Sequence, residues 1–476
     1  MTDTLDERRF AWRPFLRNLC AIAIPVAMQN LLTTTGSMVD TIMVKPLGED
    51  TVGALGLCAQ YSSLMFSCYW GFVGGGMLFM SQYYGAKDEK GVERSYGMTM
   101  FFLLSVALLF GAMAIFCPEM IMKLYTNKAG HQAIGVQYLR IVGYAYIFQV
   151  ISMGMSILLR TTGHATIPLI ASIVSVSTNI FLNWVLIGGH LGAPAFGIKG
   201  AAMATVAAGI VNVLVIVILA AAIRYRLLFR IRKHFAWSRA SIRNYLHKCF
   251  PIICNELLVG IGFMIINITL GRQPEHIINA VSVFRIIEGL IIGFFAGFSN
   301  ASSILVGTCV GEGQPRVAFE RAKRLIYLCS GVIATVEIIL FALRRPILTT
   351  MSLSGQSYAA GVNLLLIYFI AAVFRMGNWM QNDTYRVSGD TIFGTVLEIS
   401  FQYAMVIPCM LLAAFYFHAP YWVVFLCCYI DEPIRYFLMQ CHFYSAKWIK
   451  PVTEVGKKAL EAFLKERKGE ASAQEG

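Results

Sequence analysis

The chain has 476 residues, of which 57% are hydrophobic and only 14% are charged. A soluble domain carries about 25% charged residues, so this composition excludes an ordinary soluble protein. The net charge of +13 does not indicate a nucleic-acid partner, because the basic residues gather in segments between long apolar runs. That distribution is typical of membrane topology.

About twelve apolar segments follow one another along the chain, and each can cross a bilayer, which takes about 20 residues in a helix. Uninterrupted spans of helix length exclude a transmembrane β-barrel, so we predict an all-α polytopic membrane protein. The expected spans are 17–44, 54–80, 97–117, 137–160, 166–188, 197–223, 249–271, 278–306, 324–344, 361–386, 392–415 and 421–443.

Most Lys and Arg residues outside the spans lie on one side of the membrane. They occupy the N-terminal tail, the loop after the second span, the stretch 224–248 and the segment after Ala446. By the positive-inside rule this side is the cytoplasm. We therefore expect both termini to be cytoplasmic and the protein to lie in the cell (inner) membrane, with lipids as contacts of the basic residues.

The two halves of the chain match at a constant offset of 226 residues. The matching pairs are Pro25 with Pro251, Gly71 with Gly297, Gly85 with Gly311, Arg160 with Arg386, and Gly163 with Gly389. Six helices in each half make the repeat parallel, so we expect two six-helix lobes related by a pseudo-two-fold axis. The predicted divisions are an N-terminal lobe at 1–223, a basic linker at 224–248, a C-terminal lobe at 249–443 and a charged tail at 444–476.

Asp40 stands alone as a carboxylate within the spans of the first half. A charge at a helix centre costs about 2.5–3.5 kcal/mol on insertion scales and is usually kept for function. At about 1.5 Å per helical residue, Asn179, Asn183 and Thr205 fall at a similar depth. The carboxylate, amide and hydroxyl oxygens of these four residues are suitable ligands for Na⁺. Coupling to a proton requires only the Asp40 carboxylate. The competing interpretation is that the three neutral residues are hydrogen-bonding contacts between helices.

In these segments the chain resembles the multidrug and toxic compound extrusion (MATE) family, over about residues 15–445. The segments that carry the resemblance are 39–44, 81–86, 160–163, 179–184, 197–205, 307–313 and 386–390. The resemblance implies twelve helices in two lobes and export driven by Na⁺ or H⁺, typically of cationic amphipathic drugs. It also implies that Asp40 is a coupling residue. The positions implied to line a cation site are Asn179, Asn183, Ala201 and Thr205.

The chain departs from the family pattern at two points. Some members carry a second carboxylate where this chain has Asn183, so the spans of the first lobe hold a single negative charge, Asp40. Other members use carboxylates on the seventh and tenth helices. Here Glu256 stands about one turn early, and Arg375 lies near the expected position of the tenth-helix acid. We therefore do not expect that second ion site in this chain.

The second half holds many charged residues within its spans. The spacings of Arg285 with Glu288, and of Asp431 with Arg435, predict ion pairs within one helix. Charges within a membrane usually pair, so pairing is the first interpretation of the remaining charges as well. The alternative is that unpaired acids among them line a substrate cleft, because the family's seventh and tenth helices face it. The predicted cleft residues are Glu256, Asp383, Gln29 and Gln82, with Glu398 as a further candidate acid.

The leading hypothesis is a secondary antiporter that exports organic, cationic or amphipathic compounds in exchange for Na⁺ or H⁺ by alternating access. The alternative is a flippase for lipid-linked saccharides or other polyprenyl lipids, which Arg140, Arg285 and Arg375 keep open. An enzyme is not expected, since the eight histidines are scattered and no Gly-x4-Gly-Lys-Ser/Thr motif is present. We expect a small organic substrate, no cofactor and a monomer.

Overall fold

The computed structural model describes residues 11–351 and 353–474, which form long helices and no strand. The first half contains α1 (Trp12–Val44), the 3-10 turn η1 (Lys45–Leu47), α2 (Glu49–Gly85), α3 (Glu89–Phe116), α4 (Pro118–Tyr125), α5 (Ala129–Thr161), α6 (Thr166–Gly188), α7 (Ile198–Ala222), α8 (Arg226–Phe229) and α9 (Ile231–His234). The second half contains α10 (Arg239–Leu270), α11 (Glu275–Gly311), α12 (Pro315–Ala342), α13 (Arg344–Thr350), α14 (Gly355–Val387), α15 (Phe393–Phe401), η2 (Gln402–Val406), α16 (Ile407–Leu411), η3 (Leu412–Tyr416), α17 (Tyr421–Cys427), α18 (Glu432–Ser445) and α19 (Glu454–Gln474).

The helix bounds confirm the internal repeat. Adding 226 to the first and last residues of α2, α3 and α5 gives the first and last residues of α11, α12 and α14. The start signals differ between the halves, since Asp88 caps α3 by accepting a hydrogen bond from the Gly91 amide, whereas Pro315 opens α12. The two lobes therefore share one helix plan that different local residues specify.

Within the described residues, eleven helices are long and apolar enough to cross a membrane. The twelfth expected span, 421–443, is not one helix but two, α17 and α18, which a turn at residues 428–431 separates. Pro433 lies in the first turn of α18, where its missing N–H costs nothing, but it would interrupt a continuous helix. The break places Tyr429 and Asp431 inside the C-terminal lobe.

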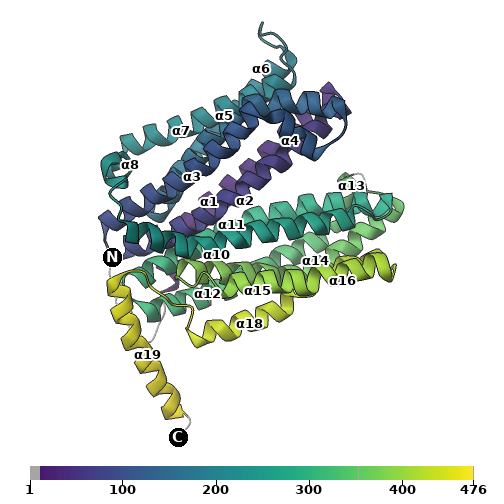
Figure 1. The fold of residues 1–476 in the computed structure, drawn as a ribbon. Helices are drawn as coiled ribbons and strands as arrows, with labels where there is room; N and C mark the ends of the chain where they lie inside the picture. Colours follow the sequence, from purple (N-terminus) through teal and green to yellow (C-terminus); the bar gives the residue numbers. More distant parts are fainter. Residues whose placement is uncertain (1–10, 352, 475–476) are drawn as a thin grey trace.

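Both ends of the described chain lie at one end of the molecule, which we call the terminal end; α4 and α13 lie at the opposite, distal end (Figure 1). At the terminal end α1 packs against α11 and α2 against α10, so the lobes contact each other there. Toward the distal end the two sets of helices diverge (Figure 1).

Four glycines allow this close contact between the lobes. The contacts are Gly71 with Ile253, Gly297 with Ala27, Gly85 with Thr308, and Gly311 with Gln82. They form two pairs that the 226-residue offset interchanges, so the contact follows the pseudo-two-fold axis. A Cβ atom at any of the four positions would come closer than 3.0 Å to the facing helix. Glycine is therefore required for the helices to approach this closely.

The segment after α18 joins the two lobes at the same end. The Gln82 amide of α2 donates to the Val387 carbonyl at 2.8 Å and accepts from the Val452 amide at 2.8 Å. The Thr453 hydroxyl donates to the Gly311 carbonyl at 3.0 Å. Gln82, which we predicted in the substrate cleft, is thus fully buried in the lobe contact.

Asp390, in the loop after α14, also holds this segment. It contacts His442 at 2.9 Å and Lys450 at 2.9 Å. Burial would raise the pKa of Asp390, but the hydrogen bonds from His442 and Lys450 outweigh it and hold the pKa below its usual value. Asp390 therefore stays ionised at neutral pH and keeps the segment attached to α14.

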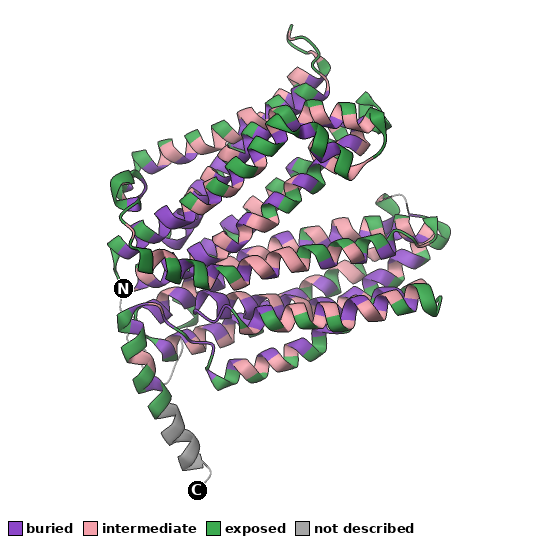
Figure 2. Cartoon of the chain, in the orientation of Figure 1, coloured by how far each residue is buried: buried purple, intermediate pink, exposed green. Residues whose placement is uncertain are grey.

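Large apolar side chains are exposed along the outer faces of the long helices (Figure 2). Leu109 on α3, Ile218 on α7 and Ile370 on α14 are each at least 60% exposed. Such surfaces are unfavourable in water but not in hydrocarbon. The exposed faces are therefore those that meet lipid.

Candidate ion and substrate sites

In the N-terminal lobe, Asp40 at the distal part of α1 lies against α6. The Asn183 amide donates to Asp40 at 2.5 Å and also lies 3.2 Å from Oδ1 of Asn179. Asn183 is 1% exposed, and its own Oδ1 is buried without a hydrogen-bond partner. The three predicted residues on α1 and α6 therefore form one cluster with a spare oxygen.

Thr205 and Ala201, one turn apart on α7, complete the predicted set. The Thr205 hydroxyl donates to the Ala201 carbonyl at 3.0 Å, and the Tyr138 hydroxyl of α5 lies beside Thr205. No group of three or more His, Cys, Asp or Glu residues forms a metal site in the described part of the chain. A role of Asp40, Asn179 and Asn183 in binding Na⁺ or H⁺ stays a prediction.

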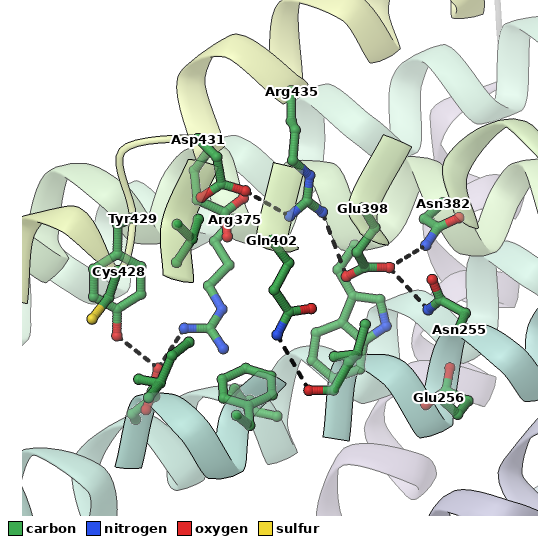
Figure 3. Close-up of a pocket in the computed structure, with 18 of the residues that line it drawn as sticks. Asn255, Glu256, Arg375, Asn382, Glu398, Gln402, Cys428, Tyr429, Asp431 and Arg435 are labelled. Atoms are coloured by element: carbon green, nitrogen blue, oxygen red, sulfur yellow. Dashed lines mark hydrogen bonds and ion pairs between the residues drawn. The ribbon is translucent and has the colours of Figure 1, made fainter. Parts of the chain in front are cut away.

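The C-terminal lobe encloses a cavity of about 320 Å³ (Figure 3). Its walls are α10, α11, α14, the α15–η2 segment and the turn between α17 and α18, with Trp70 of α2 as a contribution from the other lobe. Four arginines and five acids line it. Of the four predicted cleft residues, Glu256 lines this cavity, whereas Asp383, Gln29 and Gln82 do not.

Glu288 of α11 is at the centre of the first group of ion pairs. It contacts Arg285 at 2.5 Å and Arg375 at 2.6 Å, and it accepts a hydrogen bond from Tyr429 at 3.1 Å. The predicted Arg285–Glu288 pair is confirmed. Arg375, from α14, was not assigned a partner by sequence, because its partner lies on another helix.

Arg435 of α18 forms the second group. It contacts Asp431 at 3.0 Å, which confirms the predicted pair, and Glu398 at 3.5 Å. Glu398 also accepts hydrogen bonds from Asn255 at 3.0 Å and Asn382 at 3.1 Å (Figure 3). These two asparagines are site residues that we missed, although amides within predicted spans are a usable signal.

Arg386 of α14 forms the third group, with Glu256 at 3.1 Å and Asp383 at 3.5 Å. Asp383 also accepts a hydrogen bond from Ser299. Glu256, Asp383 and Glu398 are therefore all paired, as the pairing interpretation predicts and the alternative of unpaired acids does not. A lone carboxylate is costly in a membrane, and arginines on neighbouring helices supply the missing charge.

Arg160, the repeat partner of Arg386, joins the lobes instead of lining the cavity. It is buried and donates to Gln29 of α1 at 2.5 Å and to Asn300 of α11 at 3.4 Å. Gln29, a predicted cleft residue, is thus a contact of Arg160 near the lobe boundary. Equivalent positions in the two halves have acquired different partners.

Replacing Glu288 with glutamine should strongly destabilise the C-terminal lobe. The change leaves Arg285 and Arg375 without their carboxylate in the membrane, and breaking a buried pair costs about 3–5 kcal/mol. We expect a lower melting temperature in detergent, measured by tryptophan fluorescence. The matched control is Glu119→Gln, whose pair with Arg140 is about half exposed on both sides and is worth at most about 1 kcal/mol. Equal melting temperatures for Glu288→Gln and Glu119→Gln would contradict this role of Glu288.

Two lobes that contact at one end, a buried aspartate with two asparagines in one lobe and a charged cavity in the other are features of a membrane transporter. The MatE family model matches residues 25–185 and again 251–411, so the chain belongs to the MatE family. The two matches are offset by the same 226 residues as the internal repeat. Members of this family are transporters, so the protein is a transporter that moves compounds by secondary transport and is not an enzyme.

Curated relatives cover most of the chain. The transporter YisQ of Bacillus subtilis (strain 168) is 21% identical over 440 residues, 91% of this chain and 95% of YisQ. YoeA of the same organism, a probable multidrug resistance protein, is 24% identical over 82% of this chain and 85% of its own. A probable multidrug resistance protein NorM of Thermotoga maritima is 23% identical over 91% of this chain and 93% of its own.

Solved structures share the fold. A crystal structure of MATE in complex with MaL6 has a TM-score of 0.81 at 17% identity and covers 90% of this chain and 97% of its own. An outward-facing multidrug resistance MATE family transporter has a TM-score of 0.77 at 18% identity. The match covers 90% of this chain and 96% of that transporter. The twelve-helix, two-lobe plan predicted from the sequence is therefore confirmed, with its last helix broken.

Proposed function

We propose that the protein is an antiporter that exports small organic compounds and that Na⁺ or H⁺ couples to export at Asp40. The hydrogen bond from Asn183 to Asp40, which is the one carboxylate within the spans expected from the sequence of the first half, is the observation that carries this proposal. The names of YoeA and the NorM relatives support organic substrates.

Either ion would change the Asp40 cluster in the same way. A protonated Asp40 needs an acceptor, and a bound Na⁺ needs oxygen ligands, but Asn183 now presents its NH₂ group. Rotation of the Asn183 amide would present Oδ1, which has no partner at present. Ion binding would therefore replace the contact between α1 and α6 with a different one.

Helix α1 is placed to carry this change to the other lobe. Asp40 lies in its distal part, whereas Ala27 and Gln29 lie where α1 meets α11 and Arg160. We place the terminal end in the cytoplasm, because the basic segments lie there. The lobes would then be closed toward the cytoplasm, and export would require the contact at the four glycines to open.

The test is ethidium efflux from energised cells that express the chain. The pH gradient is dissipated at constant Na⁺, and the Na⁺ gradient is dissipated at constant pH. Export that stops in the first condition identifies H⁺, and export that stops in the second identifies Na⁺. Efflux that survives both treatments would contradict ion coupling.

The flippase alternative gives a different result in the same cells. A lipid-linked saccharide flippase would not extrude ethidium, so the dye would accumulate as in cells that lack the protein. The arginines of the cavity are the observation that favours this alternative, but each is paired with a carboxylate in the structure. Absence of efflux of any tested dye would overturn the proposal of drug export.

A further inference from the structure

We infer that the cavity of the C-terminal lobe binds amphoteric compounds, with an anionic group at one end and a cationic group at the other. This inference deepens the proposed export function and rests on it for its biological role. It follows from which member of each ion pair faces the cavity.

At one end of the cavity, which we call the basic end, the arginines are accessible and the carboxylate is covered. The side chains of Arg285 and Arg375 are 27% and 15% exposed, whereas Glu288 between them is 4% exposed. Glu432, the other acid that interacts with Arg375, is also covered: it is 6% exposed and accepts a hydrogen bond from Asn378 at 2.8 Å. A ligand at this end meets cationic N–H donors, which suit a carboxylate.

At the other end, which we call the acidic end, the exposure is reversed. Glu256 and Glu398 are 23% and 21% exposed, whereas their partners Arg386 and Arg435 are each 9% exposed. Here the carboxylates face the cavity and the arginines lie behind them. A ligand at this end meets acceptor oxygens, which suit an ammonium or amidinium group.

The two ends are separated along the same helices. Arg375 and Asn382 are seven residues apart on α14, which is about 10 Å along the helix axis. Arg375 and Tyr429 lie at one side of the cavity, and Asn255, Asn382 and Glu398 lie at the other (Figure 3).

The cavity also has aromatic and apolar side chains in its walls. Phe263, Trp379 and Val259 line the cavity, with Trp70 from the other lobe, and the Gln402 amide lies between the two ends (Figure 3). A volume of about 320 Å³ is at the lower limit of drug-sized pockets. The cavity therefore matches a flat aromatic compound that carries both charges, better than a compound with a cation alone.

Two dyes test this inference, because they differ in one group. Rhodamine 110 carries a free carboxylate and a cationic xanthene, and rhodamine 123 is its methyl ester and lacks the anion. Binding is measured on the purified protein in detergent by fluorescence anisotropy, with empty micelles as background. We expect rhodamine 110 to bind about tenfold more tightly, as one charged hydrogen bond predicts.

Substitutions in the cavity show which residues produce the preference for rhodamine 110. Arg375→Gln should remove the preference by weakening rhodamine 110 alone, and Arg375→Lys, which keeps the charge, should retain part of it. Glu256→Gln should weaken both dyes. Arg345→Gln, at an exposed position on α13, is the control for loss of a positive charge and should leave both affinities unchanged.

Equal affinity for the two dyes, tighter binding of rhodamine 123, or no binding of either dye above the micelle background would overturn the inference. So would an Arg375→Gln protein that elutes as wild type in size exclusion and keeps the preference. The measurement needs no ion gradient. A preference in detergent without dye export by cells would therefore contradict the proposed function and leave the binding site standing.

Discussion

Replacing Asp40 with asparagine should abolish coupled export and leave the fold intact. Asparagine has the same shape and can still accept the hydrogen bond from Asn183. It has no charge for an ion to neutralise, so the ion can no longer favour one conformation over the other. A coupling free energy of about 1–3 kcal/mol corresponds to a 5- to 150-fold effect. We therefore expect the rate of ethidium efflux to decrease by a factor in this range.

The stability of Asp40→Asn distinguishes a coupling role from a structural one. Removing a charge from a membrane helix relieves an insertion cost of up to about 2.5–3.5 kcal/mol, so the melting temperature should stay the same or rise. Asp50→Asn, whose carboxylate is 76% exposed beside His131, is the matched control and should export normally. Full efflux by Asp40→Asn, or a marked loss of its stability, would refute the coupling role.

The architecture could be predicted from the sequence because the residues that repeat are those on which close packing of the helices depends. Helices of opposite lobes meet at Gly71 and Gly85 and at their repeat partners Gly297 and Gly311. Because both halves need glycine at these contacts, the same residue occurs in each half at a spacing of 226. The broken last span was missed because hydropathy does not register Pro433. Because the residues on both sides of the turn are apolar, hydropathy alone predicts one continuous helix.

The Asp40 cluster was predictable for a physical reason. Its members lie on helices whose ends are visible in the sequence, so depth arithmetic brings Asp40 and Asn183 to the same level. The ion pairs of the cavity were predictable only within one helix, as for Arg285 with Glu288. Arg386 and Glu256 lie on different helices, and a single sequence does not give the rotation of one helix against another.

Replacing Gly311 with alanine should open the terminal end. A Cβ atom there would come closer than 3.0 Å to the main chain of Gln82, so α2 and α11 could not approach as they do now. Overpacking costs about 1–3 kcal/mol, and here the cost falls on the closed arrangement alone. The population should shift 5- to 150-fold toward the conformation in which the lobes separate at this end, and export should fall because the closed state is part of the cycle.

Cys249 reports this opening. It is fully buried on α10 and packs against Gly75 of α2, so it reacts with N-ethylmaleimide only when the lobes part at the terminal end. We expect Gly311→Ala to speed its labelling, measured by mass spectrometry, and Gly85→Ala to do the same because the two positions are related by the repeat. Gly331→Ala is the control, since nothing lies within 4 Å of its Cβ position. Labelling and export at wild-type levels in Gly311→Ala would show that this contact does not close the transporter.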